Sequence, residues 1–203
     1  TFYGNGMDGI YIASSVEGTG SVRIEDNRIS ENGAVLCGIH VSGTVYGVLD
    51  ILDNDIGYWE DGLGGEHYGN GGDGIWIERV DSVMYSSAIT IGNNTIMDNL
   101  GDGVYIGSIG TGMYVPAISV IIEDNVIMEN GIDGVYIGNA VCAAVVGICQ
   151  NVIFGHDTGV YLGNGTCGVD VTCNVIGFND EGIWINGDFN TIMKWADEIR
   201  TMK

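Results

Sequence analysis

Residues 122–137, IEDNVIMENGIDGVYI, contain the two short motifs from which the fold can be predicted. The first motif is an apolar residue, two variable residues, Asn, one variable residue and Ile, as in residues 122–127, and a second Asn follows at Asn130. The second motif is Asp-Gly-Val-Tyr-Ile at residues 133–137. Apolar residues alternate with other residues in both motifs, which is the two-residue period of a β-strand.

Both motifs recur along most of the chain. The glycines of the second motif are spaced 23 to 36 residues apart. They are Gly9, Gly38, Gly74, Gly103, Gly134, Gly159 and Gly182. The asparagines of the first motif lie between these glycines and predict one ladder: Asn27, Asn54, Asn94, Asn125, Asn151 and Asn174, with a further copy at Asn190. A repeat of this length is the signature of a solenoid.

The repeat predicts an all-β solenoid of about seven rungs over residues 1–192. No segment between the motifs has the length and period of a crossover helix, so equivalent strands should stack as parallel sheets about 4.8 Å apart. Inward Ile residues would form the core, and the asparagines would bond to one another at a bend. The recurring glycines suit either a positive φ or a close backbone approach. Residues 193–203 break the pattern and have helical potential, so they predict a short C-terminal helix that serves as a cap or a subunit contact.

These motifs resemble the right-handed parallel β-helix repeat family, the NosD-type repeat, over nearly the whole chain. The resemblance implies a right-handed coil. It does not define a function, because this fold hosts enzymes, adhesins, phage tailspikes and surface-layer proteins. The acidic, cysteine-containing composition is also similar to that of sheath or surface-layer proteins of methanogenic archaea that are built on β-helical coils.

Composition excludes several classes of protein. The chain has 203 residues, 45% of them hydrophobic, which fits one folded domain rather than a disordered chain. Twenty-seven acidic residues against six basic ones give a formal net charge of −21, which argues against a nucleic-acid partner. No apolar run is long enough for a membrane span. The chain begins without Met or a signal peptide, so a processed, extracellular or cell-surface form is expected.

The acidic residues of the repeats are expected to face outward and to stack as like charges. They include Asp8, Asp73, Asp102 and Asp133, with Glu25, Asp26, Asp53, Glu123 and Asp124. Diffuse divalent cations such as calcium would relieve this repulsion. The spacing of the acids and of the three His residues predicts neither a fixed metal site nor a cofactor.

One rung is longer than the others, because Gly74 follows Asn54 by 20 positions where other rungs have 8 to 11. Insertions in solenoids map to loops that often bind ligands. The residues that would contact a carbohydrate or a metal here are Trp59, Glu60, Asp61, Glu66, His67 and Tyr68. The alternative is a solvated Gly-rich loop without a ligand.

Five cysteines are candidates for disulfides or cross-links: Cys37, Cys142, Cys149, Cys167 and Cys173. Cys142 and Cys167 both lie eight residues after a motif Gly, so stacking would bring them within disulfide range. Cys149 and Cys173 have neighbouring but offset places in the repeat. Cys37 takes the place of the motif Asp and is expected to face outward. The odd count favours a free thiol or an intermolecular bond, although unpaired cysteines can also serve as small apolar residues.

No catalytic set is recognisable. Gly155-His156-Asp157 and Arg23-Ile24-Glu25 do not match the signatures of polygalacturonase-type hydrolases, and no Arg or Lys has a lyase-like setting. His156 takes the place of the second Asn of a repeat and is expected to be a bend residue. Six aromatic residues should form an outward stripe that binds sugars, a neighbouring subunit or a covering loop: Tyr11, Trp76, Tyr105, Tyr136, Tyr161 and Trp184.

Two functions are consistent with these features. The first is an extracellular structural protein, not an enzyme, that self-assembles as a homopolymer into a surface layer, sheath or fibre through β-helix stacking and cysteine cross-links. The second is a β-helix that binds or cleaves polysaccharides, with the long loop and the aromatic stripe as its groove.

Overall fold

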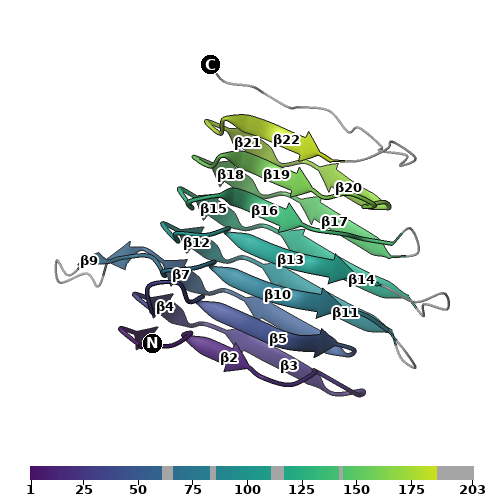
Figure 1. The fold of residues 1–203 in the computed structure, drawn as a ribbon, viewed down its shortest axis with the longest axis horizontal. Helices are drawn as coiled ribbons and strands as arrows, with labels where there is room; N and C mark the ends of the chain where they lie inside the picture. Colours follow the sequence, from purple (N-terminus) through teal and green to yellow (C-terminus); the bar gives the residue numbers. More distant parts are fainter. Residues whose placement is uncertain (61–65, 83–85, 111–116, 142–143, 187–203) are drawn as a thin grey trace.

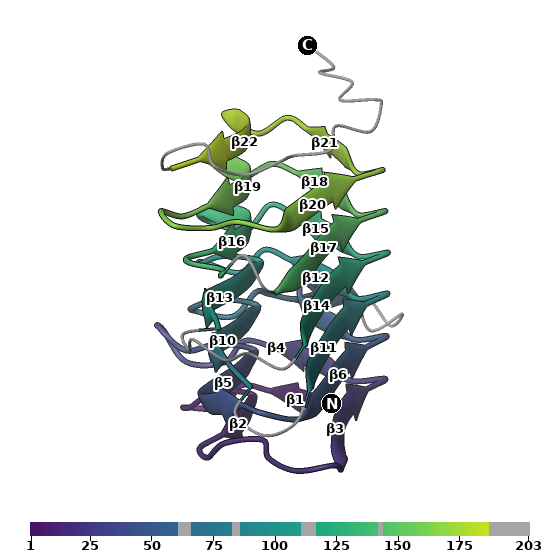
Figure 2. The ribbon, with the colours of Figure 1, turned by 90° about the vertical axis from the view of Figure 1, so that its right-hand side faces the viewer.

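The computed structural model describes residues 1–60, 66–82, 86–110, 117–141 and 144–186. In these ranges the chain forms an all-β coil in which six rungs each contribute one strand to each of three parallel sheets and the last described rung contributes to two of them (Figures 1 and 2). The predicted parallel β-helix of about seven rungs is confirmed. The C-terminal segment 193–203, with its expected helix, lies outside the described residues.

The first sheet, called here the short sheet, has strands of two or three residues. Its order is β1 (Phe2–Tyr3), β4 (Arg28–Ser30), β7 (Asp55–Gly57), β12 (Thr95–Met97), β15 (Val126–Met128), β18 (Val152–Phe154) and β21 (Val175–Gly177). The second, called the aromatic sheet, has the order β2 (Ile10–Ile12), β5 (Ile39–Val45), β10 (Ile75–Val80), β13 (Val104–Ile109), β16 (Asp133–Ile137), β19 (Thr158–Leu162) and β22 (Glu181–Ile185).

The third sheet has six strands and completes the coil. Its order is β20 (Val169–Thr172), β17 (Val145–Cys149), β14 (Ile118–Glu123), β11 (Ser87–Gly92), β6 (Val48–Leu52) and β3 (Ser21–Glu25). The long rung adds a small antiparallel hairpin, β8 (Trp59–Glu60) and β9 (Glu66–His67), which projects beside the coil in Figure 1.

The core is a set of aliphatic ladders, as the alternating pattern predicts. In the short sheet the ladder of Ile residues has one member in each rung from β4 to β21, and each is in register with the next. Those in the middle rungs have no exposed surface, whereas the last is 8% exposed. The ladder consists of Ile29, Ile56, Ile96, Ile127, Ile153 and Ile176. It removes a continuous apolar column from water along the coil axis.

The motif glycines serve close approach rather than positive φ. A Cβ on Gly103 would lie 2.5 Å from Cγ2 of Ile127 and 2.6 Å from the carbonyl oxygen of Gly134. The positive φ angles occur instead at the residue before each ladder Asn, with values of 55–58°. These residues are Asp26, Asp53, Asn93, Asp124, Gln150 and Cys173. Asp and Asn tolerate this left-handed conformation better than most residues, which explains the recurring Asp-Asn pair.

Candidate functional site

The predicted Asn ladder lies at the bend between the third sheet and the short sheet. The side-chain oxygen of Asn125 accepts hydrogen bonds from the backbone N–H and the side-chain amide of Asn94, at 2.9 and 3.0 Å. The amide of Asn125 donates to the carbonyl of Ile91 at 2.8 Å. Asn54, Asn94, Asn125 and Asn151 are about 1% exposed, whereas Asn27 and Asn174, at the two ends of the ladder, are half-buried. The ladder therefore has a structural role, because its side-chain amides form hydrogen bonds with neighbouring rungs.

A second polar ladder follows the short sheet. It consists of Asn5, Asn32, Asn70, Asn99, Asn130, His156 and Asn179, joined from rung to rung. His156 is 4% exposed, accepts the N–H of Asn130 at Nδ1 and bonds the carbonyl of Ile127 through Nε2. Burial lowers the pKa of His156, so the ring is neutral at pH 7. His156 thus lies at a bend, as expected, and Asn70, which follows the long insertion, belongs to this ladder.

The acidic residues of the second motif do not face solvent, and the expectation of an outward acid stack is wrong for them. Asp73, Asp102 and Asp133 are only 6–9% exposed. Oδ1 of Asp73 accepts the backbone N–H of Asp102 at 2.6 Å, and Oδ1 of Asp102 accepts that of Asp133 at 2.8 Å. The carboxylates turn inward because each satisfies a backbone donor of the next rung that nothing else reaches.

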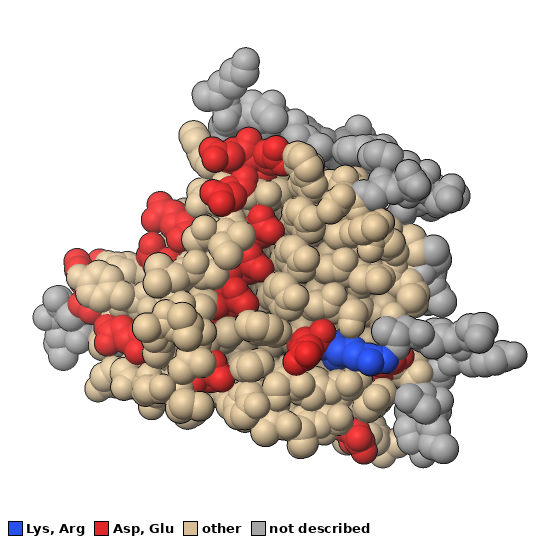
Figure 3. All heavy atoms as spheres, viewed as in Figure 1, with Lys and Arg blue, Asp and Glu red and all other residues tan. Residues whose placement is uncertain are grey.

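Asp73, Asp102 and Asp133 form a third ladder, and burial is the main cause of the raised pKa values of its carboxyl groups. It raises the pKa of Asp73 to about 6 and that of Asp102 to about 7, and it raises the pKa of Asp133 as well. Acidic side chains gather mainly over the left half of the face in Figure 3.

Cys37 occupies the same ladder position, and the expectation that it faces outward is wrong. It is 2% exposed, its backbone N–H donates to Asp8 at 2.7 Å, and the backbone of Asp73 bonds its sulfur. Burial raises the pKa of this thiol to about 12. Cys37 therefore replaces an aspartate as an acceptor and is unavailable for a bond to another chain.

The aromatic stripe lies on the outer face of the aromatic sheet. The rings of Tyr105 and Tyr136, and those of Tyr136 and Tyr161, stack with centroids 4.8 and 4.9 Å apart and planes within 6°. His40, which sequence reasoning left out, joins Tyr11 to Trp76 with centroid distances of 5.0 and 5.2 Å. Register alone would have revealed it, because His40 pairs with both neighbours. The stripe thus spans Tyr11, His40, Trp76, Tyr105, Tyr136 and Tyr161, with Trp184 paired to its last member.

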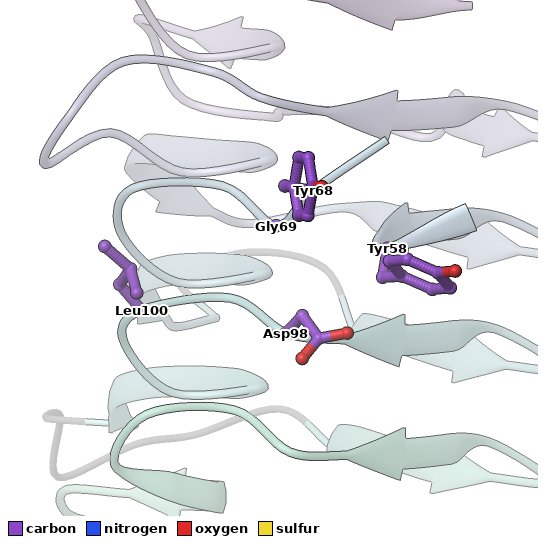
Figure 4. A pocket seen from close by; sticks show the side chains of 5 residues that line it. All are labelled: Tyr58, Tyr68, Gly69, Asp98 and Leu100. Carbon is purple, nitrogen blue, oxygen red and sulfur yellow. The ribbon is translucent and has the colours of Figure 1, made fainter. Parts of the chain in front are cut away.

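The long rung forms a shallow pocket of roughly 510 Å³ between the hairpin and the bend after β12. Its lining residues are Tyr58, Tyr68, Gly69, Asp98 and Leu100 (Figure 4). The hydroxyls of Tyr58 and Tyr68 donate to Glu60 and Glu66 at 3.1 and 3.3 Å. Burial, followed by the charge of Glu129, raises the pKa of Asp98. The pocket therefore offers aromatic surface and acceptor oxygens.

The remaining residues of the expected binding loop are spread around this hairpin. His67 turns away from the glutamates of its own hairpin and contacts Glu31 at 3.3 Å and the ring of Tyr3 at 5.2 Å. Trp59 pairs with His67 through the backbone. Asp61 lies outside the described residues. Among the expected contact residues whose side chains the structure describes, Tyr68 alone lines the pocket.

The cysteines divide into different settings. Cys37, Cys149 and Cys173 are free thiols. Cys149 is half-buried and Cys173 is exposed. Cys167 is disulfide-bonded. Cys142 lies outside the described residues, so its pairing stays a prediction. Within the described part of the chain, no group of three or more His, Cys, Asp and Glu side chains could hold a metal ion.

Comparison with known proteins agrees with the geometry. Residues 81–176 match the family described as a right handed beta helix region. The three stacked parallel sheets of the described residues form a parallel β-helix, and this match is to a family with that fold. No match was found among curated proteins or among solved structures. Over the described ranges, no helical segment has the length and hydropathy needed to cross a bilayer.

Proposed function

We propose that this protein is an extracellular structural protein that associates with further copies of itself into a surface layer, sheath or fibre. The observation that carries the proposal is the aromatic stripe, which runs the length of the aromatic sheet. Its end members Tyr11 and Trp184 are 53% and 45% exposed, and the rings between them are half-buried. A continuous aromatic surface of this kind is typical of a protein interface.

The geometry of the stripe favours a protein partner over a sugar. Sugars bind aromatic side chains through the ring faces, but Tyr105, Tyr136 and Tyr161 stack their faces against one another. The stripe therefore presents ring edges and hydroxyls in a row with the spacing of the rungs. A second copy carries the same spacing, so the two stripes can match along their whole length.

The described residues also support a role other than catalysis. Most of the buried polar residues that the structure describes belong to the three ladders, where they bond to the backbone and to one another. Among the thiols, Cys173 is exposed and can reach another chain, whereas Cys37 cannot. In the proposed assembly, the main contact is between the aromatic stripes of two copies, and cross-links through cysteines such as Cys173 are secondary.

The proposal is tested by sedimentation velocity over a range of protein concentrations, with and without reductant. We expect the wild type to form concentration-dependent multimers and Tyr136→Glu to remain monomeric, because a charge would interrupt the stripe. Thr90→Glu, on the outer face of β11, is the matched control and should associate like the wild type. A wild type that stays monomeric at all concentrations contradicts the proposal.

A second candidate function is supported by the pocket beside the hairpin. Two tyrosines, the carboxylate of Asp98 and the apolar side chain of Leu100 suit one ring of a neutral or amino sugar. The high negative charge of the chain disfavours uronates. Glycan-array binding by the wild type that Tyr68→Ala abolishes and Tyr11→Ala retains would support this function and place the sugar in the pocket rather than on the stripe.

A further inference from the structure

Two free cysteines meet at one corner of the coil, where the third sheet turns into the short sheet. Cys149 is the last residue of β17 and is in register with Thr172 of β20, so Cys173 lies one residue beyond its direct partner. Strands about 4.8 Å apart and a rise of about 3.3 Å per residue give a Cα separation of roughly 5.8 Å. This separation lies inside the range that disulfides span.

Cys173 departs from the residues that other rungs use at its place, whereas the place of Cys149 varies from rung to rung. The positions in register with Cys149 hold Leu52, Gly92, Glu123 and Thr172. Cys173 has a φ of 56°, in a column whose other members are Asp, Asn and Gln. Cys has no side-chain oxygen to stabilise this conformation. A cysteine at this left-handed position, with a second cysteine beside it on the preceding rung, indicates a role for the pair.

The two thiols are open to chemistry in a way that Cys37 is not. Cys173 is exposed and Cys149 is half-buried. Cys149 is close enough to Cys173, Glu123 and Asp124 for all three to raise its pKa, although burial is the larger cause. The exposed Cys173 can react with an oxidant from solvent. Cys149, on the preceding rung, can then react with the oxidised Cys173.

We propose that Cys149 and Cys173 form a reversible disulfide within the chain that joins the last two rungs of the third sheet. A low-molecular-weight disulfide such as oxidised glutathione is the oxidant. The Cys173 thiolate attacks it and displaces one thiol, which leaves a mixed disulfide. The Cys149 thiolate then attacks the Cys173 sulfur and displaces the second thiol. Two protein thiols have lost their protons and two electrons, and the oxidant is reduced to two thiols.

The bond would lie near the C-terminal end of the described coil, where burial of the core decreases. Ile176 is 8% exposed, whereas its counterpart Ile127 has no exposed surface, and Val175 is 47% exposed. The disulfide closes a loop of one rung, from the end of β17 through β18 and β19 to the bend after β20. Closing this loop reduces the freedom of the unfolded chain and should restrain these rungs against local opening.

The experiment incubates the full chain at low protein concentration with oxidised glutathione and then measures intact mass, free thiols and thermal unfolding. We expect a monomer that has lost two hydrogen atoms, a proteolytic fragment in which Cys149 and Cys173 are joined, and a rise in Tm of roughly 5–10 °C. Dithiothreitol should restore the thiols and the lower Tm.

Variants keep the result interpretable. Cys149→Ser and Cys173→Ser should each lose the intact-mass change and the rise in Tm, and Cys37→Ser should retain both. Retention of all thiols in the oxidised wild type overturns the proposal, as does a dimer bonded through Cys173. That dimer would support the cross-linking part of the proposed function, so the two ideas fail separately.

Discussion

At the residue scale, the polar side chains of the bends act as substitutes for missing backbone partners. Asn125 satisfies two places on the preceding rung, because its oxygen accepts from Asn94 and its amide donates to the carbonyl of Ile91. The carboxylate of Asp102 accepts a hydrogen bond from the backbone N–H of Asp133 on the next rung. Such side chains are buried because the bend leaves backbone groups that no strand can satisfy.

The Asn ladder is tested by Asn125→Leu. Leu has a similar volume but leaves the N–H of Asn94 without an acceptor, so the free energy of unfolding should fall by about 1–3 kcal/mol. Asn164→Leu, at an exposed position, is the control and should change stability by less than about 0.5 kcal/mol. Chemical denaturation measures both, and equal effects would contradict the structural role of the ladder.

The aspartate ladder predicts the pH dependence of stability. The folded pKa values of Asp73 and Asp102, about 6 and about 7, lie above the value of about 3.9 for an unfolded chain. The folded state therefore binds protons more tightly, and the free energy of unfolding should rise by about 2–4 kcal/mol as the pH falls from about 8 to about 5.

Asp102→Asn tests this assignment directly. The amide oxygen can still accept the N–H of Asp133 but does not titrate, so the variant should gain stability at pH 8 and show a flatter pH profile. Asp170→Asn, an exposed substitution on β20, is the matched control. A profile for Asp102→Asn as steep as that of the wild type would mean that other groups cause the pH dependence.

At the scale of the strands, alternation along each short element decides which side chains enter the core. Val126, Ile127 and Met128 form β15, and only the middle residue is fully buried. Ile127 is in register with Ile96 and Ile153 on the neighbouring rungs, so its removal leaves a gap in a continuous column.

Ile127→Ala should lower the free energy of unfolding by about 2–5 kcal/mol, because the surrounding rungs cannot collapse into the cavity. Val126→Ala, on the same strand but directed outward, should cost much less. Urea unfolding followed by circular dichroism distinguishes the two variants. A cost for Ile127→Ala below about 0.5 kcal/mol would mean that the strand faces the other way.

At the scale of the whole molecule, a net charge of −21 opposes both folding and association. The described residues contain no group of acids that could hold a metal. Diffuse screening by divalent cations should relieve this repulsion. Ca²⁺ and Mg²⁺ at equal concentration should raise Tm equally, measured by calorimetry. A specific preference for Ca²⁺ would reveal a fixed site, because the two ions differ in the ligand geometry they accept.

The repeat by itself determined the architecture of this protein. A two-residue alternation interrupted every 23 to 36 residues by the same Asn and Gly leaves few folds other than a stacked coil. The Ile ladder, the Asn bends and the place of His156 follow from register alone, because equivalent residues of successive rungs must lie above one another.

Only the tertiary structure decided which polar residues are inside. Asp102 and Cys37 stand at the edge of a strand, where the sequence period cannot tell an outward side chain from one that curls back to a backbone N–H of the next rung. That choice depends on an unsatisfied donor supplied by another rung. The same holds for Asn70, which belongs to a ladder because the long insertion leaves the coil as a hairpin and returns in register.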